Sequence, residues 1–299
     1  MKKIILLLIT TSLTIVSANA QDVLSTEDMN SIYKKDRSSS KRIQAYAPLR
    51  EADVMWSRKI WREIDLRQKI NHPFYYPEND GVAHTIDDRK SLIDVIYSAI
   101  QEGSITAYGN ASMDDEMREP MTQEEIKSIG GAKEEIIRVP DWDAIAAGAD
   151  PEEAYKDTVN VIPFNRNTVK KWRIKEEWFF DKQRSVMDVR IIAIAPLQED
   201  RDEVTGELLG GFSPLFWVHF PEARKILINA EVFNLVKNDA ERRTYDDIFW
   251  KRMFGSVIVE ESNVMDRKLN EYMVGLDALL EAEKIKAEIF NLEHDMWEY

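Results

Sequence analysis

The feature that most constrains the fold is a run of alternating residues in the second half of the chain. Residues 186–195 are rich in β-branched side chains. The apolar residues on one side of this run are Met187, Val189, Ile191, Ala193 and Ala195. A period of two is typical of a strand with one buried face. We expect Pro196 to end the strand, because proline has no N–H to donate to a neighbouring strand.

Two further apolar runs flank this strand. Residues 172–180 contain two tryptophans and two phenylalanines, and residues 215–220 form a short run that Pro221 closes. The connection over residues 198–213 is acidic and rich in glycine, and it shows no helical pattern. Strands joined in this way are expected to be antiparallel. We therefore predict an α+β fold, with a mostly antiparallel sheet and packed helices.

An aromatic segment lies nearer the N-terminus. Over residues 56–69 the apolar positions fit both a helix and a strand, so periodicity leaves its structure open. Its aromatic residues and those that follow are Trp56, Trp61, Phe74, Tyr75 and Tyr76. Such a cluster can be core, a sugar-stacking platform or a partner-binding surface. Because three adjacent aromatic residues cannot all point inward, we predict that part of the cluster contacts a partner.

Two segments of similar pattern suggest an internal duplication. Thr85 and Thr244 each begin a Thr-apolar-Asp-Asp sequence, and a helix, a Gly-Ser pair and a strand are expected after each. Common capping chemistry explains the match as well as duplication into two related subdomains does.

An acidic segment separates these two copies. Residues 113–157 carry 14 acidic and 5 basic residues, and a capping box at Thr122 predicts a short helix. We interpret the segment as a linker or insertion. The expected division is an N-terminal subdomain over 49–112, the acidic segment over 113–157 and a C-terminal subdomain over 158–299.

The first 48 residues are expected to be separate from the folded part. Residues 1–20 combine a positive start, a short apolar run and small residues before a cleavage site, which is typical of a signal peptide and predicts a periplasmic location. Residues 21–48 form an arm that is basic and serine-rich. Its basic residues are Lys34, Lys35, Arg37, Lys41 and Arg42. This arm is either solvated or docked onto an acidic neighbour, such as another copy of the chain.

The C-terminal residues 275–299 predict a long helix with two apolar stripes. One stripe contains Leu276, Leu279, Leu280, Ala287, Phe290 and Trp297, and the other contains Ile285, Ile289, Leu292 and Met296. A helix on a single core has one stripe. Two stripes predict burial on both sides, within the chain or between chains, and we take the second stripe as a candidate partner interface.

The composition argues against several functions. The formal net charge of −14 disfavours binding to nucleic acid or anionic lipid. The sequence has no cysteine, and its four histidines are far apart and lack metal-ligand spacing. Paired carboxylates are expected by chance among 54 acidic residues. We therefore predict no enzymatic activity, no metal and no cofactor.

Several blocks of the sequence resemble the gliding-motility GldN (PorN) family of Bacteroidota. These blocks are residues 56–77, 81–108, 172–196, 216–224, 246–249 and 276–299, with Glu-His-Asp-Met-Trp-Glu-Tyr at 293–299 the most distinctive. The resemblance implies a periplasmic component of the type IX secretion system. It also implies a ring formed with an outer-membrane lipoprotein of GldK (PorK) type, connected to an inner-membrane motor with a GldM (PorM) shaft. It supplies no catalytic residues. The alternative from the residues is a periplasmic glycan-binding protein or glycoside hydrolase with an aromatic platform.

Overall fold

A computed structural model describes residues 41–78, 89–109, 115–140, 155–201, 207–232, 234, 241–265 and 267–296. Residues 41–299 form one compact unit. Several predicted features lie outside the described residues: the signal peptide, the arm before Lys41, Thr85 and Trp297.

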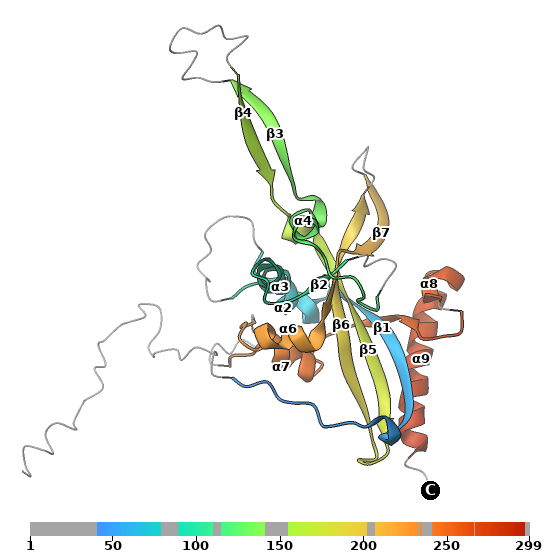
Figure 1. The fold of residues 1–299 in the computed structure, drawn as a ribbon. Coiled ribbons are helices and arrows are strands. Elements are labelled where there is room, and N and C mark those ends of the chain that lie inside the picture. Colours follow the sequence, from blue (N-terminus) through green and yellow to red (C-terminus); the bar gives the residue numbers. More distant parts are fainter. Residues whose placement is uncertain are drawn as a thin grey trace, which may run out of the picture. The chain divides into compact units, whose positions relative to one another are not determined.

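A seven-stranded sheet forms the centre of this unit (Figure 1). Six of its strands follow the order β2-β8-β6-β5-β1-β9, and β7 pairs with β6. The strands are β1 (Val54–Asp65), β2 (Ala107–Tyr108), β5 (Val169–Asp181), β6 (Val186–Arg201), β7 (Leu208–Pro214), β8 (Trp217–His219) and β9 (Val257–Glu261). Every pairing is antiparallel, which confirms the predicted α+β fold.

The longest strand continues past the predicted stop at Pro196. β6 runs to Arg201, and its residues from Leu197 to Arg201 pair with β7. A proline removes only one donor from a ladder. The carbonyl of Pro196 still accepts a hydrogen bond from the Leu215 amide at 3.0 Å. The prediction that the strand ends at Pro196 was therefore wrong. The predicted strand at 215–220 is also shorter than expected, because Phe220 already begins helix α6.

The aromatic segment that periodicity left open is strand β1, which joins the two predicted subdomains. β1 pairs with β5 along most of its length and with β9 on its other side. Residues 49–112 and 158–299 thus both contribute strands to one sheet. Long-range pairing of this kind leaves no local signal in the sequence.

Helices pack with the strands around two buried clusters. The larger cluster includes Trp172, Ile174 and Ile194 of the sheet together with residues of five α-helices. These helices are α2 (His72–Tyr75), α3 (Leu92–Gln101), α4 (Gln123–Lys127), α6 (Phe220–Leu227) and α7 (Tyr245–Trp250). Ser91 caps the N-terminus of α3, and Thr244 caps the N-terminus of α7. The predicted capping role of Thr244 is confirmed.

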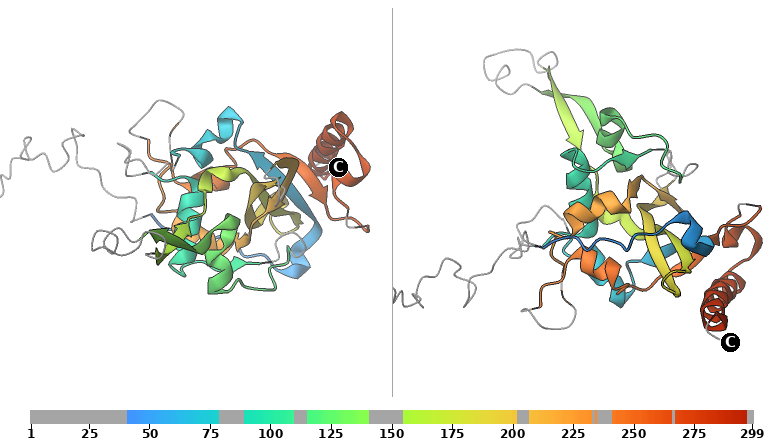
Figure 2. Two further views of the ribbon diagram at one scale, coloured as in Figure 1. Left: turned by 90° about the horizontal axis from the view of Figure 1, so that it is seen from above. Right: turned by 60° about the horizontal axis from the view of Figure 1, so that its bottom comes forward.

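The C-terminal helices surround the second cluster. Helix α9 (Leu276–Asp295) lies along β1 and β9, with α8 (Leu269–Tyr272) beside it, away from the other helices (Figures 1 and 2). Ile285 and Ile289 of α9 pack there against Ile60 and Ile258. The predicted long C-terminal helix is confirmed.

The acidic segment is more ordered than a linker. It contains α4 (Gln123–Lys127), whose predicted capping box between Thr122 and Glu125 is present. It also contains a two-stranded sheet of β3 (Lys133–Pro140) and β4 (Tyr155–Ile162). Its residues 113–114 and 141–154 lie outside the described residues.

Candidate interaction surfaces

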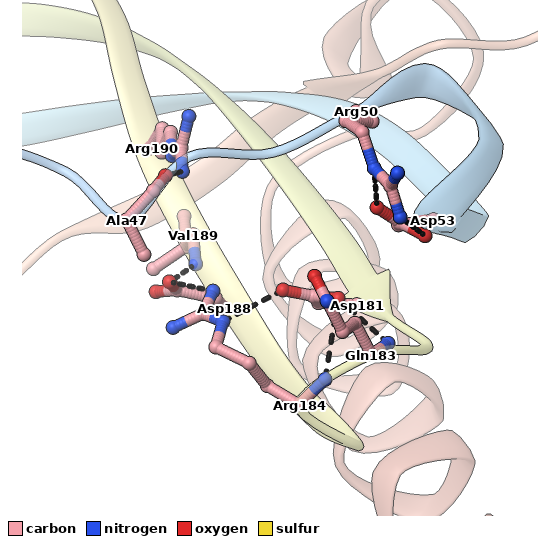
Figure 3. A network of polar contacts seen from close by, with 9 residues as sticks. All are labelled: Ala47, Arg50, Asp53, Asp181, Gln183, Arg184, Asp188, Val189 and Arg190. Atoms are coloured by element: carbon pink, nitrogen blue, oxygen red, sulfur yellow. Dashed lines mark hydrogen bonds and ion pairs between the residues drawn. The ribbon is translucent and has the colours of Figure 1, made fainter.

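The part of the arm that the structure describes is anchored to the folded unit. We call residues 41–48 the strap. The ring of Tyr46 contacts two arginines, with the Arg190 and Arg224 guanidinium carbons 5.0 and 4.8 Å from its centroid. Arg190 also donates from Nη2 to the Ala47 carbonyl at 2.6 Å (Figure 3). Arg190 lies in β6 and Arg224 lies in α6, so two regular elements hold the strap in place. We call the residues that contact the Tyr46 ring its seat.

The strap also contacts helix α7. Tyr46 stacks on Trp250 with ring centroids 5.3 Å apart. Burial raises the pKa of the Tyr46 hydroxyl, although the charge of Arg224 acts in the opposite direction. Tyr46 thus remains a neutral ring in contact with two cations and with the Trp250 ring.

One basic residue of the arm meets an acidic helix start. Lys41 Nζ lies 3.0 Å from Asp247 Oδ2, and Asp247 also caps α7 through Thr244. Burial opposes ionisation of Asp247, but hydrogen bonds from Lys41 and Thr244 outweigh it and hold the pKa of this carboxyl below its usual range. The structure therefore places Lys41 on an acidic site of its own chain, while Arg42 is exposed. Lys34, Lys35 and Arg37 lie outside the described residues.

A cavity of about 480 Å³ lies next to the strap, with Tyr46, Trp250 and Phe249 in its lining. The charged residues that line this cavity form ion pairs with other residues of the same chain. Arg184 donates from Nε to Asp181 at 2.6 Å and from Nη2 to Asp188 at 3.2 Å (Figure 3). Arg252 pairs with Glu176 at 2.8 Å. These internal pairs indicate a structural cavity with little free charge to offer a ligand.

The five aromatic residues predicted as one cluster are dispersed. Trp56 packs under α9, whereas Trp61 lies in a different buried cluster and donates from Nε1 to Asp115 at 2.6 Å. Phe74 is in the main core, 1% exposed. Because the residues face different surroundings, the structure does not bring them together as a sugar platform.

Only the end of this aromatic series is at the surface. Tyr76 is 42% exposed and contacts Tyr75 edge-to-face, with centroids 5.1 Å apart. The Tyr75 hydroxyl accepts a hydrogen bond from Lys170 Nζ at 3.0 Å. The expectation that three adjacent aromatic residues cannot all point inward agrees with this arrangement, which leaves Tyr76 free for a partner.

The two apolar stripes of α9 have different surroundings. Ile285 and Ile289, predicted to contact a partner, are 2% and 5% exposed and pack against the sheet of the same chain. Leu292 and Met296 at the end of this stripe are half-buried. The opposite stripe is at the surface, with Leu276 69%, Leu279 51%, Leu280 59% and Phe290 67% exposed. The stripe open to a partner is therefore the one that the sequence did not single out.

Metal and membrane features give no further site in the described part of the chain. Among the described residues, no three histidine, aspartate or glutamate side chains gather in a way that could hold a metal ion. None of the helices in the described ranges is both long and apolar enough to cross a bilayer.

No pattern in the sequence indicated the seat of Tyr46. Its residues come from positions 46, 190, 224 and 250, and each is unremarkable in its own segment. Cation–π stacks between distant segments have no sequence spacing that could identify them.

The comparison with known families identifies one match. The family described as "Gliding motility associated protein GldN" matches residues 49–298. No curated protein matches the chain. The family match begins just after the strap and includes the sheet, its helices and nearly all of the C-terminal segment.

Proposed function

Because this chain belongs to the GldN family of gliding motility associated proteins, we propose that it is a non-enzymatic structural subunit of a periplasmic type IX secretion ring. The description of the family names gliding motility, which supports a role in the motility and secretion machinery. The observation that carries the proposal is the family match over residues 49–298, which extends through the whole described fold except the strap.

The proposed partners follow from the proposed place of the protein. Residues 1–20 direct export to the periplasm, and an outer-membrane lipoprotein of GldK (PorK) type holds the exported chain at the inner face of the outer membrane. A shaft of GldM (PorM) type connects the assembly to the inner-membrane motor. The ring supports protein export across the outer membrane and, through exported adhesins, gliding motility.

Two surfaces of the described chain support a role in assembly. The outer stripe of α9 exposes four large apolar side chains in a row along one helix. Exposed apolar surface of this kind is typical of contacts with other proteins. The strap fixes the end of a basic arm to one side of an acidic protein, so opposite charge can guide neighbours into place. Repeated contacts between copies close into a ring when their rotation closes.

Solution mass tests this proposal. The chain from Gln21 onwards is measured by light scattering and electron microscopy, alone and after co-expression with the neighbouring outer-membrane lipoprotein. We expect small species alone and large rings with the lipoprotein. An unchanged small mass in the presence of the lipoprotein would overturn the proposal.

The arm is tested separately by deletion of residues 34–42. We expect ring assembly with the lipoprotein to become weaker and more sensitive to salt, because charge steering depends on ionic strength. Rings that form normally at physiological salt would remove the arm from the assembly mechanism.

A further inference from the structure

The outer face of helix α9 carries a pattern that is complementary to itself. Leu279, Glu283, Lys286 and Phe290 follow each other at spacings of four, three and four residues. At 3.6 residues per turn, positions three and four apart lie one above the other on one side of a helix. The four side chains therefore form one line, with an apolar residue at each end and two opposite charges in the middle.

All four side chains of this line are accessible. Leu279 and Phe290 are 51% and 67% exposed. Glu283 and Lys286 are 72% and 59% exposed, and their charged atoms lie 3.3 Å apart. A rotation of about 100° around the helix separates the line from Ile285 and Ile289, which hold α9 against β1 and β9. Figures 1 and 2 show α9 at the side of the sheet away from α2, α3, α6 and α7.

Two copies of this line are complementary when one runs antiparallel to the other. When two such helices lie antiparallel, Leu279 of one faces Phe290 of the other, and Glu283 faces Lys286. The spacing of four, three and four is the same in both directions, so all four contacts form together. A two-fold interface requires this self-complementarity, because the same patch must fit itself.

We propose that the outer face of α9 binds the same face of a second copy of this chain, as an antiparallel pair related by a two-fold axis. The inference deepens the proposed structural function, on which it rests, by naming one contact between copies. Two reciprocal apolar contacts bury Leu279 and Phe290, and two reciprocal ion pairs fix the register between them.

Neighbouring residues on the same face fit this arrangement. Ala287 lies between Glu283 and Phe290 on the outer face, and its small side chain permits a close approach of the two helices. Leu276 and Leu280, 69% and 59% exposed, add apolar surface on the same side. Burial of this apolar surface between two copies favours their association.

A charge-reversal pair tests the proposal on the chain from Gln21 onwards. Self-association is measured by sedimentation and light scattering over a wide range of concentrations, without the lipoprotein. Glu283→Lys alone places two lysines against two lysines, and Lys286→Glu alone places two glutamates against two glutamates. We expect each variant to dimerise roughly tenfold more weakly than the unchanged chain.

A mixture of the two variants gives the decisive measurement. In a mixed pair every lysine of one copy faces a glutamate of the other, so we expect the dimer to return as a heterodimer. Lys225→Glu, a charge reversal on the exposed surface of α6, is the matched control and should dimerise like the unchanged chain. Circular dichroism and thermal unfolding establish that all variants remain folded.

Three results would overturn the inference: a monomer at every concentration, single variants that dimerise as strongly as the unchanged chain, or a mixture that stays monomeric. Failure here is distinguishable from failure of the proposed function. Rings with the lipoprotein but no dimer of the chain alone would reject only the α9 contact, whereas an α9 dimer that never joins a ring would reject only the ring.

Discussion

Arg224 of α6 and Asp246 of α7 form a buried two-point ion pair beneath the strap. Nε of Arg224 lies 2.6 Å from Asp246 Oδ1 and Nη2 lies 3.1 Å from Oδ2. The same guanidinium lies against the rings of Tyr46 and Trp250, at 4.8 and 5.0 Å. One side chain therefore joins two helices and seats the strap, so its loss affects both.

Replacing Arg224 with alanine should cost about 3–5 kcal/mol in the free energy of unfolding, because it leaves Asp246 buried without its partner. Urea unfolding measures this cost. Lys225→Ala on the exposed side of α6 is the matched control and should change stability by less than about 0.5 kcal/mol. The double variant Arg224→Met with Asp246→Leu should recover most of the loss. A double variant as unstable as Arg224→Ala would contradict the ion-pair explanation.

Tyr46→Ala should release the strap from its seat. The ring contacts two arginine cations, and each such contact contributes about 0.5–2 kcal/mol. Hydrogen exchange of the amides over residues 43–49 should become faster, while exchange in β5 and β6 stays unchanged. Tyr46→Phe retains the ring and serves as the control. Equal exchange in all three proteins would show that the ring does not hold the strap.

Acidification should loosen the contact between Lys41 and Asp247. The pKa of Asp247 is lowered in the folded chain, so folding favours its ionised form. This stabilisation is present above the ordinary carboxyl pKa near 4 and is lost as the pH falls through the lower folded value. Protection of the strap amides, corrected for the intrinsic pH dependence of amide exchange, should therefore decrease below about pH 4.

Asp247→Asn is the control for this pH dependence. The variant lacks the titrating group, so its strap should exchange faster at neutral pH and change less on acidification. Other paired carboxylates, including Asp181, titrate in both proteins and cancel in the comparison. An identical pH profile in the two proteins would contradict the assignment to Asp247.

Asn71→Ala should destabilise the connection between the start of α2 and the start of β9. Its buried side chain donates to the carbonyls of Asp65 and Gly255 at 2.8 and 2.9 Å. It also accepts from the Gly255 amide at 2.9 Å. Alanine leaves these backbone groups unpaired, at an expected cost of about 3 kcal/mol in urea unfolding. Asn229→Ala, at an exposed position, should have little effect, and equal losses at both sites would contradict this account.

Local patterns in the sequence predicted much of the sheet and several helices. The strands around residues 172–180 and 186–195, the capped start of α7 and the long C-terminal helix all follow from periodicity and capping. These features depend on residues within a few positions of one another. The limits of the strands were less accurate, because Pro196 keeps its carbonyl partner and Phe220 begins a helix.

The candidate site was less predictable, since its residues are brought together from distant parts of the chain. The sequence identified the aromatic residues 56–76 as a cluster, whereas the structure disperses them among separate environments. It did not indicate the seat of Tyr46, which β6, α6 and α7 form jointly.

The sequence by itself determined that α9 has two apolar stripes, because helical geometry fixes which side chains share a face. Only the tertiary structure decided which stripe is buried. Ile285 and Ile289 meet Ile60 and Ile258, residues more than two hundred and about thirty positions away in the chain. In the same way, pairing with β5 made the ambiguous segment Val54–Asp65 a strand. Periodicity records how a segment is shaped, whereas the partner of each face depends on contacts that only the folded chain forms.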